Sequence, residues 1–133
     1  MNSGQDKKML TAISKRVFIC SPYRGDVSEN IERAKQYCRF AALTGSIPFA
    51  PHLLYTQFLD DTIEYERMGG IHCGLNFLTA CKELWIFGAN GISEGMRMEI
   101  TEANRLGIET RRMDRVFAAW KKGREGDDGA NGG

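Results

Sequence analysis

Residues Glu83 to Gly107 read ELWIFGANGISEGMRMEITEANRLG, which predicts a buried strand, a glycine-containing loop and a helix. Leu84 to Phe87 form the short apolar run typical of a strand covered on both faces. Ser93 stands where a helix N-cap is expected, after a loop with two glycines. The helix that follows carries apolar residues at helical spacing: Met96, Ile100, Ala103 and Leu106. It therefore begins beyond the carboxyl end of a parallel strand, where free backbone N–H groups suit phosphate or another anion.

Ser93, Gly95 and Glu99 form the pattern S-x-G-x-x-x-E across this loop and helix. Gly95 lets a ligand approach the backbone of the first turn. Glu99 follows one turn later, on a face that we expect to differ from the apolar stripe. A carboxylate held beside a ligand can be a nucleophile or a general base. The alternative is that Glu94, Glu99 and Glu102 form the solvated face of an amphipathic helix.

The rest of the chain alternates apolar strands with helices. We expect further strands at Arg16–Cys20, Ser46–Ala50 and Ile108–Arg111. We expect the remaining helices at Asp26–Gly45, at Ile63–Lys82 with a bend at Gly69-Gly70, and at Met113–Lys122. Leu53–Leu59 is expected to be a short helix or an ordered loop. This order predicts an α/β fold, a Rossmann-like or flavodoxin-like doubly wound parallel sheet of four to five strands with helices on both faces.

The chain has 133 residues, enough for one domain with its own core. We expect a flexible leader over residues 1–15, a single α/β domain over 16–122 and a disordered glycine-rich tail over 123–133. The formal net charge of +1 gives no electrostatic reason to expect a nucleic acid polymer or a membrane as partner. The N-terminus lacks the apolar core of a secretion signal, so we expect a cytoplasmic protein.

Four cysteines are present, at positions 20, 38, 73 and 81, and no two of them have the C-x-x-C spacing. Each lies in or beside an apolar run, so we expect reduced core thiols rather than disulfides or a zinc site. His52 and His72 complete no set of ligands with the spacing of a metal site. We therefore expect no metal.

Ligands of doubly wound sheets bind beyond the carboxyl ends of the strands. The loops that leave three predicted strands there carry the candidate substrate-binding residues: Ser21, Tyr23, Arg24, Gly25, His52, Ser93 and Gly95. Arg24 suits a phosphate or carboxylate, and the ring of Tyr23 suits a base or sugar. Taken singly, Tyr23 and Arg24 also fit an ordinary surface loop, and His52 fits a hydrogen-bonded loop histidine. Neither the G-x-G-x-x-G nor the G-x-x-x-x-G-K-[ST] nucleotide motif is present.

Three motifs give the chain a resemblance to a known superfamily: FICSPYRGD at Phe18–Asp26, PFAPH at Pro48–His52, and SEGMRMEITEANRLG at Ser93–Gly107. Over residues 16–110 it resembles the nucleoside 2-deoxyribosyltransferase-like superfamily, which includes the deoxynucleoside 5′-monophosphate N-glycosidases. It looks most similar to a small bacterial and phage branch.

The resemblance implies that Glu99 is the nucleophile and that Ser93 and Gly95 form a phosphate- or sugar-binding turn. The segment from Ser21 to Gly25 is similar to the first loop of the glycosidases, with one residue of difference in spacing. No metal or organic cofactor is implied. Because relatives often complete the site with a neighbour's loop, the resemblance implies a homo-oligomer, a dimer or higher.

One departure from the superfamily concerns the acid that assists the leaving base. Relatives often carry Asp-Leu-Asn in the helix before the third strand, whereas this chain has Gly74-Leu75-Asn76. Asp60, Asp61 or His52 would have to replace that acid.

The resemblance implies cleavage of an N-glycosidic bond, or deoxyribosyl transfer, on a nucleoside or nucleoside 5′-monophosphate, with retention of configuration. For this chemistry we expect Glu99 to be ionised at neutral pH.

Two alternatives stay open. The loss of the acid favours a non-catalytic nucleotide-binding or sensing module of the same fold. The apolar segment Met113–Trp120 favours a structural or partner-binding domain. The sequence leaves open the base, the sugar, the choice between hydrolase and transferase, and the number of subunits.

Overall fold

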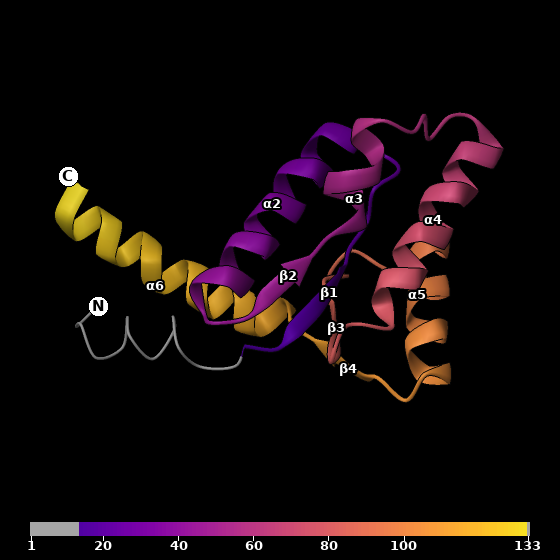
Figure 1. The fold of residues 1–133 in the computed structure, drawn as a ribbon. Helices are drawn as coiled ribbons and strands as arrows, with labels where there is room; N and C mark the ends of the chain where they lie inside the picture. Colours follow the sequence, from indigo (N-terminus) through magenta and orange to yellow (C-terminus); the bar gives the residue numbers. More distant parts are fainter. Residues whose placement is uncertain (1–13, 133) are drawn as a thin grey trace.

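The protein is described by a computed structural model that covers residues 14–132, with side chains through Glu125. Most of the predicted leader, residues 1–13, lies outside these residues. The elements in chain order are β1 (Arg16–Cys20), α2 (Val27–Leu43), β2 (Ile47–Phe49), α3 (Pro51–Leu54), the 3-10 helix η1 (Tyr55–Gln57), α4 (Glu64–Leu78), β3 (Glu83–Ile86), α5 (Glu94–Arg105), β4 (Glu109–Arg112) and α6 (Asp114–Gly132) (Figure 1).

The four strands form one parallel sheet in the order β2-β1-β3-β4. The chain moves outward from β1 to β2, then returns past β1 to β3 and continues to β4. The strand order therefore reverses between β1 and β3, and this is where doubly wound sheets bind their ligands. The topology confirms the predicted α/β, flavodoxin-like fold.

Successive side chains of the strands point to opposite faces of the sheet. Val17 and Ile19 of β1 pack in one cluster with Phe40 of α2, against which Phe117 and Trp120 of α6 also pack. Phe18 and Cys20 pack in the other, with Leu78 of α4 and with Met96 and Ala103 of α5. Figure 1 shows the sheet between these two pairs of helices, so helices cover both faces, as predicted.

Helix α4 departs from the sequence prediction at its end and at its middle. It ends at Leu78 rather than Lys82, and it continues through Gly69 and Gly70 without interruption. The second glycine lies against the segment after α3, because an added Cβ at Gly70 would be in ordinary contact with Leu59 Cδ1 at 3.5 Å.

Two further expectations differ from the structure. Helix α6 continues to Gly132, past the boundary at residue 122 where we expect a disordered tail, because the helix formers Ala118, Ala119, Lys121 and Lys122 carry it into that segment. Cys73 is exposed on α4 rather than part of the core, whereas Cys20 and Cys81 are buried. Among residues 14–132, no helix is long and apolar enough to cross a membrane.

Candidate active site

The N-terminus of α5 lies beyond the carboxyl end of β3, at the reversal point of the sheet. Ser93 has extended backbone angles and its Oγ accepts a hydrogen bond of 3.2 Å from the Met96 N–H, which confirms the predicted cap. The loop before it turns at Gly91, whose φ of +118° favours glycine. An added Cβ at Gly88 would lie 2.7 Å from Ile92 Cδ1. Gly91 supplies the positive φ of this turn, and Gly88 leaves space for Ile92 and for the Gly91 carbonyl oxygen, which would lie 3.1 Å from the added Cβ.

Glu99 is buried, with 5% of its surface exposed, beside the buried residues Met96 and Ala103 of the same helix. Positions 96, 99 and 103 are separated by three and four residues, so they share one helix face. The expectation that Glu99 lies away from the apolar stripe is wrong, and so is the alternative that places it on a solvated face. Its Oε1 atom has no hydrogen-bond partner among the described residues. A buried unpaired oxygen of this kind is unusual and calls for a functional explanation.

Burial raises the pKa of Glu99 to about 8, and the nearby Cys20 thiol, which donates to the carbonyl oxygen of Met96, opposes this rise in part. None of the ion pairs in the described part of the chain involves Glu99. The carboxyl group is thus desolvated without a cation to stabilise its charge. It is mainly protonated at pH 7 in the unliganded protein, contrary to the expectation from the sequence.

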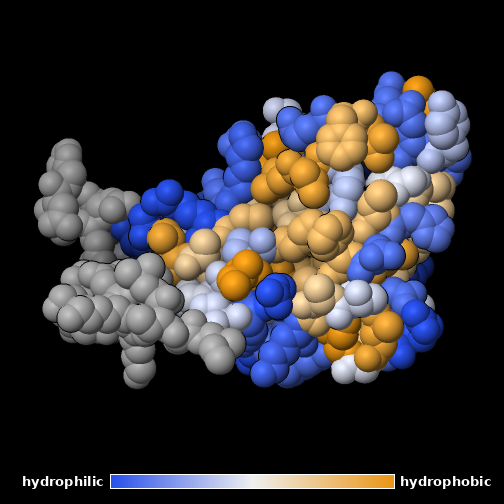
Figure 2. All heavy atoms as spheres, viewed as in Figure 1, coloured by the Kyte–Doolittle hydropathy of each residue, from blue (hydrophilic) through white to orange (hydrophobic). Residues whose placement is uncertain are grey.

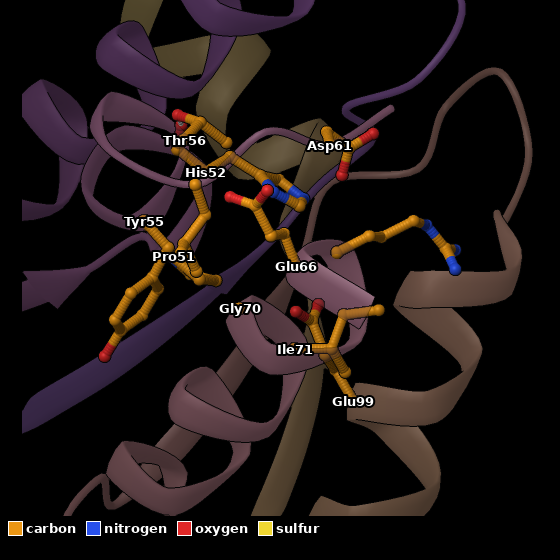
Figure 3. Close-up of a pocket in the computed structure, with 11 residues that line it drawn as sticks. Pro51, His52, Tyr55, Thr56, Asp61, Glu66, Gly70, Ile71 and Glu99 are labelled. Carbon is orange, nitrogen blue, oxygen red and sulfur yellow. Dashed lines mark hydrogen bonds between the residues drawn. The ribbon is translucent and has the colours of Figure 1, made fainter. Parts of the chain in front are cut away.

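Two cavities meet at Glu99. The first, of about 120 Å³, lies against the start of α5 and is lined by Tyr23, Arg24, His52, Asp61, Arg67, Ile71, Ser93, Glu94, Gly95 and Glu99. The second, of about 50 Å³, extends toward α3 and α4 and is lined by Pro51, His52, Tyr55, Thr56, Leu59, Asp61, Glu66, Arg67, Gly70, Ile71 and Glu99. Figure 3 shows the Glu99 carboxyl pointing toward the space between His52, Asp61 and Glu66.

Six of the eight predicted site residues line the first cavity: Tyr23, Arg24, His52, Ser93, Gly95 and Glu99. Ser21 and Gly25 line neither cavity. Ser21 is 1% exposed, and its Oγ has no partner among the described residues. Gly25 is exposed and has a φ of +100°, so it serves the turn into α2.

His52 is held by its neighbours in one tautomer. Its Nε2 lies 2.9 Å from the carbonyl oxygen of Ser21, so this nitrogen carries the proton and donates it. The ring stands 5.0 Å from the ring of Tyr23, tilted by 31°. Burial lowers the pKa of His52, although the hydrogen bond to Ser21 and the charge of Asp61 oppose this. A neutral His52 offers Nδ1 as an acceptor and is a poor acid.

Arg24 is engaged with Asp61 across the mouth of the first cavity. Its Nε donates to Asp61 Oδ2 at 3.1 Å, and its Nη2 donates to the Asp61 carbonyl oxygen at 3.3 Å. The side-chain amide of Asn30 donates to the carbonyl oxygens of Tyr23 and Arg24, which fixes the loop between β1 and α2. The guanidinium that the sequence suggests for anion binding therefore already holds a carboxylate.

Sequence reasoning missed Arg67, Ile71 and Glu66 as lining residues. Arg67 and Ile71 are four residues apart on α4, and Gly74 follows three residues after Ile71. Arg67, Ile71 and Gly74 therefore share one helix face. This helical spacing could have indicated that Arg67 and Ile71 lie on the same face as Gly74. The segment has no clear apolar periodicity, however, so the sequence did not show which face of the helix is buried. Asp60, one of the suggested replacements for the missing acid, is exposed, accepts from Thr62 and lines neither cavity.

The glycine that replaces the superfamily's aspartate is a packing position here. An added Cβ at Gly74 would lie 3.2 Å from Pro51 Cβ and 3.9 Å from Phe18 Cζ, and Gly74 lines neither cavity. A carboxylate at this position would enter an apolar contact between α4, α3 and β1 without a partner. Restoring the acid at this site would therefore require Pro51 and α4 to move apart and would strain the packing.

We expect Gly74→Asp to lower the free energy of unfolding by about 2–4 kcal/mol, because it adds steric overlap and an unpaired buried charge. Gly69→Asp is the matched control, since it lies on the same helix with open space around its Cβ position, and its effect should stay within about 0.5 kcal/mol. Urea unfolding of the two variants measures the difference. A Gly74→Asp protein as stable as the wild type would show that the site tolerates an acid.

Residues 15–113 match the model of a protein family described as "Domain of unknown function (DUF7768)". The chain belongs to this family. The DUF7768 region contains every residue that lines the two cavities at Glu99. A comparison with curated proteins finds no match.

Among solved structures, the DUF7768 chain is similar to a 2-deoxyribosyltransferase from the psychrotolerant bacterium Bacillus psychrosaccharolyticus, described as a biocatalyst for nucleoside synthesis. The two share 16% sequence identity and a TM-score of 0.53, over 71% of this chain and 69% of the other. At this identity the likeness shows the fold. It supports the fold expected from the sequence.

Proposed function

We propose that this protein acts on a nucleoside or nucleoside 5′-monophosphate, cleaving the N-glycosidic bond or transferring the deoxyribosyl group, with Glu99 as nucleophile. The observation that carries the proposal is Glu99 itself. A buried carboxyl group with an unpaired oxygen faces two cavities at the reversal point of the sheet. The fold is one that a 2-deoxyribosyltransferase also uses. No organic cofactor or metal is required for this chemistry.

In the first step, a carboxylate oxygen of Glu99 bonds to C1′ of the sugar while the bond from C1′ to the base nitrogen breaks. The base leaves with that electron pair and takes up a proton. Water or a second base then attacks C1′ and expels the carboxylate, so the configuration at C1′ is retained. Only the ionised carboxylate can attack. With a pKa of about 8, roughly a tenth of the protein is in this form at pH 7.

The other side chains of the cavities have supporting roles in this proposal. Tyr23, held against His52, offers a ring for the base or sugar. Ser93 and Gly95 present the N-terminus of α5, which suits an anionic group. Asp61 and Glu66 line the second cavity together with Glu99 (Figure 3). We propose one of these two carboxyl groups as the proton donor that relatives place at the position of Gly74.

A second candidate function is nucleotide binding without cleavage. It is favoured by the packing of Gly74 against Pro51, which leaves little room for the superfamily's acid, and by the mainly protonated state of Glu99 at pH 7. The two candidates are separated by incubating the purified protein with a panel of nucleosides and 5′-monophosphates and measuring free base by chromatography. Free base supports the first candidate. Saturable nucleotide binding without any free base supports the second.

We also propose that the chain forms a homo-oligomer. Apolar side chains are exposed on the side of the molecule that carries β2 and α3, among them Ile47 (49%), Leu54 (43%) and Phe58 (66%). Figure 2 shows hydrophobic residues gathered on this face, and large exposed patches of this kind often mark interfaces. Sedimentation equilibrium tests the proposal. A monomer at every concentration would contradict it.

A further inference from the structure

Arg67 of α4 is a nearly buried cation that lines the same two cavities as Glu99 and lacks a hydrogen-bonded carboxylate. Its side chain is 10% exposed, and the carboxylate paired with it, Glu64, lies 3.7 Å from Nη1 and is itself 74% exposed. The hydrogen bond found for its guanidinium is a 3.9 Å contact from Nη1 to the sulfur of Met68, which is a weak acceptor. Withdrawing a guanidinium from water is costly unless an anion pairs with it.

Three arginines that form salt bridges are better paired than Arg67, although their side chains are more exposed. Arg24 donates to Asp61 at 3.1 Å, Arg33 donates to Glu29 at 2.6 Å, and Arg105 pairs with Glu102. The side chains of these three arginines are 57%, 42% and 68% exposed. Arg67 is thus both less exposed and more poorly paired than these three arginines, and it lines both cavities at Glu99. This placement points to a ligand anion as its partner.

The first cavity brings Arg67 together with the first turn of α5. Ser93 Oγ accepts the N–H of Met96, and the earlier N–H groups of the helix have no acceptor within it. These groups and the helix dipole favour an anion at the same place. Three carboxyl groups line this cavity: Asp61 is bonded to Arg24, Glu94 is exposed, and Glu99 forms none of the ion pairs of the described residues.

The distance along α5 fits a nucleotide. Gly95 and Glu99 are separated by four residues, about 6 Å along a helix axis. This is comparable to the separation between the 5′-phosphate and C1′ of a nucleotide. A phosphate at the helix N-terminus would leave C1′ near Glu99 and the base directed to the second cavity, toward α3 and α4.

We propose that Arg67, with the first turn of α5, binds the phosphate of the substrate, so that the substrate is a nucleoside 5′-monophosphate rather than a nucleoside. This proposal rests on the proposed function, from which it takes the sugar and the base of the substrate. Phosphate binding by Arg67 and α5 can be measured whether or not the protein releases base. Charge-assisted hydrogen bonds between a guanidinium and a phosphate are strong and often bidentate. Their loss should therefore remove the preference for the phosphorylated ligand.

The test is calorimetric binding of a deoxynucleoside, its 5′-monophosphate, 2-deoxyribose 5-phosphate and inorganic phosphate to the full chain. We expect the wild type to bind the monophosphate at least about tenfold more tightly than the nucleoside, which corresponds to about 1.4 kcal/mol. Arg67→Met should bring the two affinities close together. Arg105→Met is the matched control, because it removes an exposed arginine of α5, and it should keep the preference.

Equal affinities of the wild type for nucleoside and monophosphate would overturn the proposal, even if base release is observed. Inorganic phosphate binding as tightly as the monophosphate would also overturn the substrate assignment. A preference that depends on Arg67 without any base release would support the phosphate site and reject the glycosidase. If Arg67→Met does not fold, Arg67→Lys serves instead. Lysine keeps the positive charge but lacks the planar guanidinium that forms bidentate hydrogen bonds. We therefore expect the preference for the monophosphate over the nucleoside to fall severalfold.

Discussion

Glu99→Gln is expected to abolish base release, with a loss of at least about 1,000-fold in rate, while leaving the fold and ligand binding intact. The amide cannot form a glycosyl ester, so the first step of the proposed mechanism has no nucleophile. The fold should survive because glutamine has the shape of the protonated glutamic acid that predominates at neutral pH. The measurement is chromatography of free base from the best substrate, beside calorimetric binding of the same ligand.

The matched control for this variant is Glu102→Gln. Glu102 lies on the same helix, is only part-buried and pairs with Arg105, away from both cavities. We expect it to keep the wild-type rate. A Glu99→Gln protein that releases base at the wild-type rate would reject Glu99 as nucleophile. Retained binding with lost turnover is the result that the proposal requires.

The second large effect is a pH-dependent gain in stability from the same substitution. The folded wild type keeps the Glu99 proton up to about pH 8, whereas the unfolded chain releases it near the ordinary pKa of 4.5. The stability that comes from holding this proton is therefore fully present below pH 4.5 and is lost as the pH rises to about 8. Glu99→Gln has no such loss. Its advantage over the wild type should grow across this range to about 3–5 kcal/mol and then level off.

Urea unfolding of both proteins at several pH values between 4.5 and 9 measures this difference. All other titrating groups are shared, so the difference isolates Glu99. For Glu102→Gln, we expect no comparable rise across the range. A difference between Glu99→Gln and the wild type that does not change with pH would mean that the pKa of Glu99 is near its ordinary value. The same titration predicts that kcat/KM of the wild type rises with pH up to about pH 8, as the carboxylate forms.

The sequence alone determined the class of fold and the edge of the sheet where the candidate site lies. Short apolar runs alternate with helical patterns, and Ser93 caps α5 as its position indicates. These are local properties, set by neighbours within one or two turns of the chain. The carboxyl ends of parallel strands lie at one edge of the sheet. The sequence therefore predicts that the loops leaving these strands lie close together. Tyr23, His52 and Glu99 were brought together by that rule.

The tertiary structure alone decided the state and partners of the residues at that edge. Glu99 becomes a buried acid only because α5 is packed on the sheet with Cys20 beneath it. Arg24 is bonded to Asp61, 37 residues away, and Gly74 is closed off by Pro51. Arg67 enters the site through α4, whose sequence has no clear apolar face. Burial, pairing and pKa depend on contacts between distant segments, and these contacts exist only once the chain has folded.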